Sequence, residues 1–322
     1  MSGSTEHRLP STESSKEARA RHGYSPAVQT CARELGVDLA QVVGTGEGGR
    51  VTKKDPAVEA FASTRSQPNA SPAPVKPVSA ATDEELIPLT PMRRSIAGHM
   101  VQSRRDAPQV TSVAEADFTN IARFREAKKD AFRQCAGVAL TFLPFIVKAT
   151  AHVLPEFPIL NARWSDDGIR VWKANHLGIA VALPEGLAVP VLRSPGTLSI
   201  AGIARRIATM VRRAQEGRLL PKEVMGSTFT VKNFGADGIL IGAPILNPPE
   251  VGILGVGSIG KRAVVLSDPN GDSIGIRVRG YLCLSYDHRA IDGAVAGAFL
   301  KRLDSTLESF QSGQDLWADP DL

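Results

Sequence analysis

The chain has 322 residues, of which 43% are hydrophobic and 5% aromatic, and its 38 Lys+Arg against 33 Asp+Glu give a formal net charge of +5. This apolar fraction can fill a core, which excludes wholesale disorder, and no run reaches the ~18–20 apolar residues of a membrane helix. The net positive charge is small, and the sequence has no basic runs interleaved with aromatic residues, which typify nucleic-acid binding. Cys31, Cys135 and Cys283 form no CxxC pair, and no secretory signal precedes them, so we expect a reduced, cytoplasmic protein.

Composition divides the chain into five predicted regions. They are a polar, disordered tail at 1–23, a small helical unit at 24–61, a linker rich in Pro, Ala and Ser at 62–85, a large domain at 86–312 and a terminal tail at 313–322. In the small unit, Pro26 suits a first helical position and Gly36 suits the end of that helix. Thr52 can cap a second helix that runs through Asp55 to Phe61.

Helices and strands are mixed in the large domain. Apolar residues at helical spacing predict helices within 92–100, 140–154, 200–216 and 296–307. Short β-rich runs predict two strands around the Pro-Glu-Gly turn within 176–193, and further strands within 227–235, 250–260 and 274–289. The strands resemble hairpins more than a regular βαβ repeat, so we expect an α/β (α+β) fold with a mixed sheet.

A glycine-rich loop at 44–49, GTGEGG, formally matches the G-x-G-x-x-G fingerprint of dinucleotide-binding folds. That fingerprint needs a strand before it and a helix directly after it. The small unit is too short for a βαβ fold, and Arg50-Val51 follows the loop directly. The glycines instead favour a tight loop between two helices.

The run YDHRAIDGA at 286–294 carries the most chemistry. His288 is the side chain best able to accept and return a proton near neutral pH. Asp292 follows four residues later, directly before a glycine and an apolar helix, where it can cap the helix or orient a basic partner. Taken alone, this spacing also fits a purely structural histidine. No histidine has the spacing from Cys, Asp or Glu that a metal site requires, so we expect no bound metal.

The small unit resembles the peripheral-subunit-binding domain of 2-oxo acid dehydrogenase complexes. The resemblance runs through the SPA-V start, the ARELGVDL helix end, the GTG-x-GGR loop and the T-x-x-D cap. It implies that basic side chains, with Arg33 and Arg50 as candidates, dock the decarboxylase or dihydrolipoyl dehydrogenase. Gln29 stands where the family usually has an arginine.

The large domain resembles the catalytic domain of the dihydrolipoamide acyltransferases. H-R-x-x-D-G after a strand is similar to the active-site signature of that family and of chloramphenicol acetyltransferase, and blocks such as LTFLPFIVKA and NPPEVGILGVGSI extend the resemblance from Ile87 to about Phe310. It implies a chloramphenicol-acetyltransferase-like fold, with a mixed sheet and flanking helices. The implied reaction moves an acyl group between a dihydrolipoyl thiol and coenzyme A, which is a substrate.

The resemblance also implies roles for individual residues. His288 is expected to act as general base in direct transfer, with Asp292 in support. Lys232 occupies the position at which the family has a Ser or Thr hydroxyl that stabilises the oxyanion, so it is a candidate replacement. Ala182 stands where many relatives have an Asp near the coenzyme A site. Residues implied to contact substrate or coenzyme A are Arg125, Thr141 and Asn233.

The implied assembly is a homotrimer with its active sites between subunits, so that His288 faces the Lys232 of a neighbour. Such trimers are expected to build a core of about 24 subunits or more. No segment before residue 24 is long enough for a lipoyl domain, so we expect a separate lipoyl-bearing protein or free dihydrolipoamide to supply the lipoyl group.

Two alternatives stay open beside the enzyme. The first is a core scaffold that docks dihydrolipoyl dehydrogenase and has weak or no activity, as the changes at Lys232 and Ala182 would allow. The second is a coenzyme A-dependent transferase of a small molecule, which the subunit-binding domain argues against. The conserved blocks do not distinguish acetyl, succinyl and branched-chain acyl groups.

Overall fold

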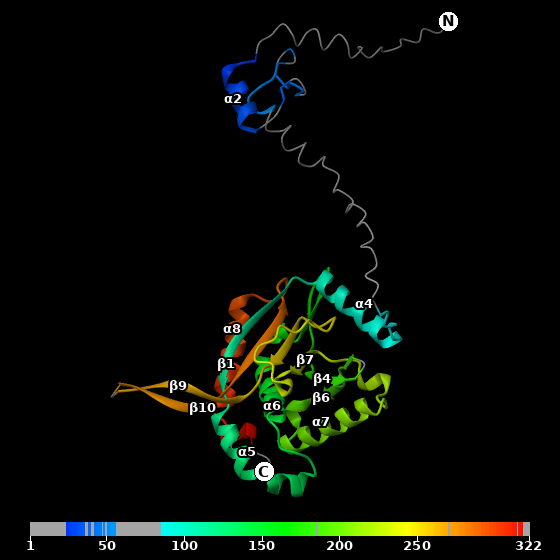
Figure 1. The fold of residues 1–322 in the computed structure, drawn as a ribbon, viewed down its shortest axis with the longest axis vertical. Coiled ribbons are helices and arrows are strands. Elements are labelled where there is room, and N and C mark those ends of the chain that lie inside the picture. The colour runs from blue at the N-terminus through cyan, green and yellow to red at the C-terminus, as the bar shows by residue number, and fades with distance from the viewer. Residues whose placement is uncertain are drawn as a thin grey trace. The chain divides into compact units, whose positions relative to one another are not determined.

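The chain folds into two compact units, Met1–Ile87 and Pro88–Leu322 (Figure 1). The computed structural model describes residues 24–35, 38–39, 42–46, 48, 50–55, 85–184, 186–269, 271–313 and 315–317. The predicted tail at 1–23, nearly all of the predicted linker and Gly36 lie outside the described residues, and the predicted domain boundaries stay predictions.

In the smaller unit, α2 (Pro26–Leu35) begins at Pro26 as the sequence predicts. The backbone carbonyl of Ser25 accepts hydrogen bonds from the amides of Val28 and Gln29, which starts the helix. Val28 and Ala32 lie four residues apart on one helical face and are buried. The predicted second helix beyond Asp55 falls outside the described residues.

The larger unit is built on an eight-stranded mixed sheet with the order β1-β10-β8-β7-β4-β5, in which β6 also pairs with β4 and β9 with β10. The β4–β7 and β7–β8 pairs are parallel and the others are antiparallel. The strands are β1 (Gln109–Asp117), β4 (His176–Leu183), β5 (Gly186–Ala188), β6 (Val191–Arg193), β7 (Phe229–Asn233), β8 (Gly252–Val256), β9 (Gly260–Asp268) and β10 (Gly271–Asp287). The mixed sheet confirms the predicted fold class.

Five α-helices flank this sheet among the described residues of the larger unit, and α6 packs between α7 and α8. They are α4 (Pro91–Asp106), α5 (Thr119–Ala136), α6 (Leu143–Val153), α7 (Ile200–Gln215) and α8 (Gly293–Glu308). None of the helices in the described part of the chain is both long and apolar enough to cross a membrane.

Shorter elements complete the unit. A separate hairpin consists of β2 (Ala162–Ser165) and β3 (Gly168–Val171). The 3-10 turns are η2 (Leu154–Glu156), η3 (Pro158–Leu160), η4 (Pro195–Thr197), η5 (Pro221–Glu223), η6 (Gly235–Asp237) and η7 (Asp315–Trp317).

Side-chain caps explain where two of the helices begin. The Thr90 hydroxyl accepts a hydrogen bond from the Arg93 amide at 3.1 Å, and the Ser199 hydroxyl accepts one from the Gly202 amide at 3.1 Å. Each bond satisfies an amide that has no partner within its helix. At the other end of α5, Gly137 has a φ of 72°, a left-handed conformation that glycine adopts without a steric penalty.

The hydrophobic core lies between the sheet and the helices α5, α6, α7 and α8. All five residues of β8 are buried, and Leu254 and Val256 belong to this core. Phe145 and Phe310 pack edge to face at 5.2 Å, and the Trp317 ring lies 5.1 Å from that of Phe310. Trp317 therefore belongs to the core, although the sequence places it in a terminal tail. Its indole buries enough apolar surface to hold η7 against the domain.

The two halves of β10 differ in their neighbours. The inner half, up to Asp287, lies between β1 and β8, and its last six residues are buried. The outer half pairs with β9, and the resulting ribbon projects from the unit (Figure 1). Ile274 and Ile276 on the outer half are 82% and 68% exposed.

Candidate active site

His288 lies in the turn that joins the buried half of β10 to α8. The Asp287 amide donates to the Val251 carbonyl at 2.9 Å, and the His288 amide donates to the Pro108 carbonyl at 3.0 Å. The amides of Ala290 and Ile291 close the turn by donating to the Asp287 carbonyl. The backbone of His288 is thus fixed from two sides while its side chain is exposed to solvent.

An ion pair braces this turn. The Arg289 guanidinium donates to both carboxylate oxygens of Asp287, with its Nη2 at 2.7 Å from Oδ2, and the Asp287 side chain is nearly fully buried. The same guanidinium lies 4.9 Å from the centre of the Trp164 ring on β2, at cation–π distance. The Asp287 carboxylate raises the pKa of Arg289. The residues on either side of His288 therefore have little freedom to move.

Asp292 lies at the N-cap position of α8, as predicted, but its side chain makes no capping hydrogen bond. Among the described residues it also has no ion-pair partner, so the basic partner that its position in the motif allows for is not found among them. The carboxylate is exposed at the same end of the sheet as His288.

Lys232 lies near the end of β7 and is half-exposed. Strand register places it opposite Gly255 of β8, which is opposite Cys283 of β10. Cys283 precedes His288 by five residues, a separation of about 16 Å along an extended strand. One copy of the chain therefore does not bring Lys232 and His288 together. The neighbouring Asn233 is exposed, and its Oδ1 accepts a hydrogen bond from the Gly235 amide at 3.0 Å.

Arg125 and Thr141 lie beyond the opposite end of β1 from His288. Arg125 on α5 donates from Nε to the Leu140 carbonyl at 2.9 Å, and its guanidinium covers the Phe142 ring at 4.8 Å. These contacts tie α5 to the segment before α6. Thr141 is exposed in that segment. The chain therefore reaches both residues from the end of β1 opposite to Gln109, which pairs with Asp287 next to His288.

A buried glutamate near the His288 end has no counterpart in the sequence analysis. Glu250 precedes Val251, whose carbonyl holds Asp287. Its carboxyl group accepts hydrogen bonds from the Ser227 and Thr230 hydroxyls, the latter at 2.6 Å, and from the Asn247 amide at 3.0 Å. Burial raises the pKa of Glu250 to about 7, because desolvation outweighs the three hydrogen bonds.

Asp55 organises the described part of the smaller unit. Its carboxylate accepts hydrogen bonds from the Thr52 amide at 2.7 Å and from the Thr45 amide and hydroxyl at 3.1 and 2.7 Å. These bonds, that from the Thr52 amide first, lower the pKa of Asp55 to about 2. The predicted docking residues Arg33, in the last turn of α2, and Arg50 are both exposed.

No cluster of three or more His, Cys, Asp or Glu suited to hold a metal ion occurs among the residues that the structure describes. The three cysteines are free thiols.

Comparison with known proteins adds to this geometry. Residues 81–313 match the family of 2-oxoacid dehydrogenases acyltransferase (catalytic domain), and residues 24–55 match the e3 binding domain. The chain belongs to the 2-oxoacid dehydrogenase acyltransferase family. It combines an acyltransferase catalytic domain of this family with a peripheral-subunit-binding domain, as the sequence predicts.

Relatives of known role support the assignment. The chain is 41% identical over 304 residues to the lipoamide acyltransferase component of the branched-chain alpha-keto acid dehydrogenase complex of Bacillus subtilis, with 89% of this chain and 71% of that protein covered. It is 38% identical to the acetyltransferase component of the pyruvate dehydrogenase complex of Corynebacterium glutamicum, covering 91% of this chain. The match spans only 44% of that longer protein.

Solved acyltransferase cores share the fold. A probable dihydrolipoamide acetyltransferase from Listeria monocytogenes is 38% identical, with a TM-score of 0.68 over 71% of this chain and 96% of that chain. A dihydrolipoamide acetyltransferase from Azotobacter vinelandii is 34% identical, with a TM-score of 0.69 over 73% of this chain and 97% of that chain. That enzyme was studied for the catalytic roles of a serine, a histidine and an asparagine. Its histidine and asparagine are four residues apart, as His288 and Asp292 are here.

The residues that hold the turn of His288 in place differ in how well the sequence predicts them. Asp287 and Arg289 flank the histidine within the motif itself, so the motif contains a signal for them. Trp164 is more than a hundred residues away and carries no signal, because only the fold brings β2 to the turn. Glu250 follows the Asn-Pro-Pro run of a block that the resemblance covers, but nothing in that run predicts its burial.

Proposed function

We propose that this chain transfers an acyl group between a dihydrolipoyl thiol and coenzyme A, with His288 as general base. The observation that carries the proposal is the turn of His288, whose backbone is fixed while its imidazole is open to solvent. A base that must exchange protons with two substrates in succession needs both properties.

The chemistry requires such a base. A thiol has an ordinary pKa of about 8.5, so most of it is protonated and weakly nucleophilic at neutral pH. His288 takes the proton of the attacking thiol as its sulfur bonds to the thioester carbonyl carbon. The tetrahedral oxyanion then collapses, the bond from carbon to the leaving sulfur breaks, and His288 returns the proton to that sulfur. No acyl-enzyme is formed.

The site is proposed to form between two copies of the chain. His288 and Lys232 lie at opposite ends of one sheet, so a second copy can bring its Lys232 to the first copy's His288. There the ammonium group would take the place of the usual hydroxyl and stabilise the oxyanion. A homotrimer, with a larger core built from trimers, is the proposed assembly. A related protein, 35% identical, forms the cubic core of a pyruvate dehydrogenase complex.

The smaller unit is proposed to dock dihydrolipoyl dehydrogenase, the decarboxylase or both. Arg33 and Arg50 are exposed, as side chains that pair with an acidic partner surface must be. We further propose that the protein works in the cytoplasm, where its three free thiols stay reduced. The lipoyl group and coenzyme A are substrates of the proposed reaction.

A second function, a docking scaffold without transferase activity, is favoured by one observation. Lys232 replaces a hydroxyl whose loss as an oxyanion donor typically lowers turnover ~10²–10³-fold. The acyl group is left to experiment, because the relatives include components of branched-chain, pyruvate and 2-oxoglutarate dehydrogenase complexes.

The test measures acyl transfer from acetyl-, succinyl- and isobutyryl-coenzyme A to free dihydrolipoamide. His288→Ala should lower turnover ~10²–10⁴-fold with all three, while His152→Ala, which changes an exposed histidine on α6, should leave it unchanged. Absence of transfer by the folded wild-type oligomer would contradict the enzyme and favour the scaffold.

A mixing experiment tests the shared site. His288→Ala and Lys232→Ala chains, each weakly active alone, should regain up to about a quarter of wild-type activity when unfolded and reassembled together. Failure of the co-assembled oligomer to regain any activity would contradict a site that takes one residue from each copy.

A further inference from the structure

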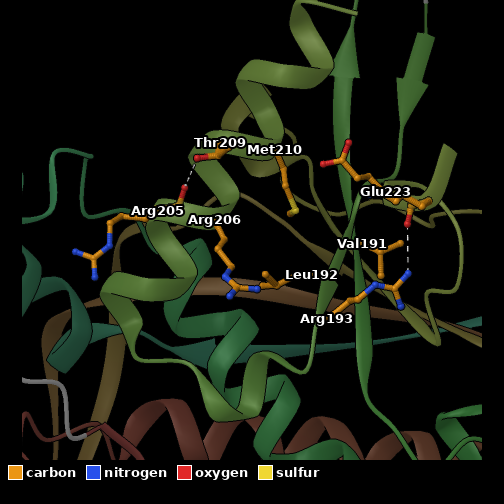
Figure 2. Close-up of a pocket in the computed structure, with 9 residues that line it drawn as sticks. Val191, Leu192, Arg193, Arg205, Arg206, Thr209, Met210 and Glu223 are labelled. Atoms are coloured by element: carbon orange, nitrogen blue, oxygen red, sulfur yellow. Dashed lines mark hydrogen bonds between the residues drawn. The ribbon is translucent and has the colours of Figure 1, made fainter. Parts of the chain in front are cut away.

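A basic groove lies between α7, β6 and η5, apart from the residues of the candidate active site. Its volume is about 460 Å³. Val191, Leu192 and Met210 form an apolar floor, of which the first two are buried. The wall residues on α7 include Arg206 and Thr209, and Figure 2 shows the Arg206 side chain beside Leu192.

The charges around this groove are unbalanced. Arg193, Arg206 and Lys222 line it together with one carboxylate, that of Glu223, whereas the side chain of the further lining residue Arg205 points away from the others (Figure 2). That carboxylate already accepts hydrogen bonds from the Arg213 guanidinium at 3.0 Å and the Leu220 amide at 2.8 Å, both through Oε2. Because the single negative charge is engaged by Arg213, the lining keeps an excess of positive charge.

One guanidinium is held in place by the protein itself. Arg193, the last residue of β6, donates from Nη2 to the backbone carbonyls of Lys222 and Met225, at 3.3 and 3.2 Å. These bonds hold the guanidinium in the lining of the groove, and its other N–H groups make no hydrogen bond among the residues that the structure describes. A guanidinium fixed in this way binds phosphate oxygens with less loss of side-chain entropy than a freely rotating one.

We propose that this groove binds an organic phosphate, whose phosphate group lies between Arg193, Arg206 and Lys222 and whose remaining part covers the half-buried Met210. The volume falls within the ~300–1,000 Å³ typical of small-molecule sites. The cationic wall selects a phosphate, and the apolar floor selects a molecule larger than inorganic phosphate. Free nucleotides and the phosphorylated end of coenzyme A both have this chemistry.

Titration calorimetry with ADP as the probe tests the site on the full-length protein. Arg193→Gln and Arg206→Gln should each weaken ADP binding at least tenfold. Arg212→Gln removes the same charge from α7 at an exposed position outside the groove, and it should change binding less than twofold. Adenosine, which lacks the phosphate, should bind at least tenfold more weakly than ADP.

Three results would overturn the site: no ADP binding at millimolar concentration, equal weakening by Arg212→Gln, or adenosine binding as tightly as ADP. Thermal unfolding of each variant ensures that lost binding does not reflect lost folding. Displacement of ADP by coenzyme A would identify the coenzyme as the source of the phosphate. Displacement by dephospho-coenzyme A as well would assign the contact to the diphosphate, and its failure would assign it to the 3′-phosphate. Displacement by neither would identify a separate organic phosphate. The binding readout is independent of acyl transfer.

Discussion

The two halves of β10 are equally strand-like in sequence but have different physical roles. The inner half is covered by strands on both sides and by helices, and Leu284 within it is fully buried. The outer half has β9 as its neighbour and exposes Ile274 and Ile276. Alternation of apolar residues therefore predicts a strand, whereas the neighbouring elements decide how much of it is buried.

The comparison also concerns the candidate active site. His288 follows directly after the buried half, so the proposed base is attached to the most constrained end of the strand. The exposed half points away from it, as the projecting ribbon in Figure 1 shows. Changes at the inner half should therefore affect both stability and activity, and changes at the outer half should spare the fold.

The largest expected effect is on the buried half. Leu284→Ala removes a core side chain from the part of β10 that pairs with β1 and β8, and it should lower the free energy of unfolding by about 2–5 kcal/mol through lost burial and a residual cavity. Urea denaturation of the larger unit measures the change. A loss below 1 kcal/mol would mean that this half of the strand is less constrained than its burial indicates.

The free energy of unfolding is expected to depend on pH through Glu250, which lies at the His288 end of the sheet. The folded chain keeps a proton on Glu250 up to about pH 7, whereas the unfolded chain releases it near pH 4.5. The unfolding free energy should therefore fall as pH rises from about 5 to 7, by about 3 kcal/mol at most.

The Glu250→Gln variant has no carboxyl proton to release at this position. Its unfolding free energy should therefore not fall between about pH 5 and 7 as that of the wild type does. Urea denaturation at several pH values compares it with Glu156→Gln, which changes an exposed carboxylate whose pKa Arg302 lowers. That control should keep the wild-type slope between pH 5 and 7. Identical slopes for wild type and Glu250→Gln would refute the assignment.

A smaller effect is expected from the brace of the turn. Trp164→Leu removes the ring beneath the Arg289 guanidinium, and it should cost about 0.5–1 kcal/mol of stability. Turnover should fall with little change in KM, because the turn that carries His288 loses a contact that holds it in place. Trp172→Leu is the control, as that indole has no contact with Arg289 among those described. Equal kinetic effects of the two substitutions would argue against the brace.

The smallest effect is expected on the outer half. Ile276→Ser replaces an exposed apolar side chain, so thermal unfolding of the protomer should change by no more than about 0.5 kcal/mol. A loss as large as that of Leu284→Ala would show that the ribbon is buried by contacts beyond one chain.

Much of the fold follows from the sequence. Helices α2, α4, α6, α7 and α8 and strands β4, β5, β7, β8 and β10 lie where periodicity predicts them, with ends that shift by a few residues. Helix α5, strands β1 and β9, the hairpin of β2 and β3, and the buried position of Trp317 are not predicted. Short strands and a lone aromatic residue near a terminus carry weak local signals.

For the site, the motif supplies His288 and its neighbours but not their geometry. Asp292 lies at the N-cap position of α8, but its carboxylate makes no capping hydrogen bond. The sequence could not predict this, because spacing along the chain does not show which way a carboxylate points. Arg125 is engaged with Leu140 and Phe142, contacts that depend on how α5 meets α6. Glu250 was missed because burial of a charged residue is a property of the folded sheet.

The placement of His288 and Lys232 at opposite ends of one sheet has a consequence for the protein before it assembles. Under the proposed shared site, a newly made, unassembled copy contains every catalytic group and yet cannot use them together. Acyl-coenzyme A would be safe from premature consumption until copies associate. Assembly would then act as the switch that starts catalysis, with no need for a separate inhibitor.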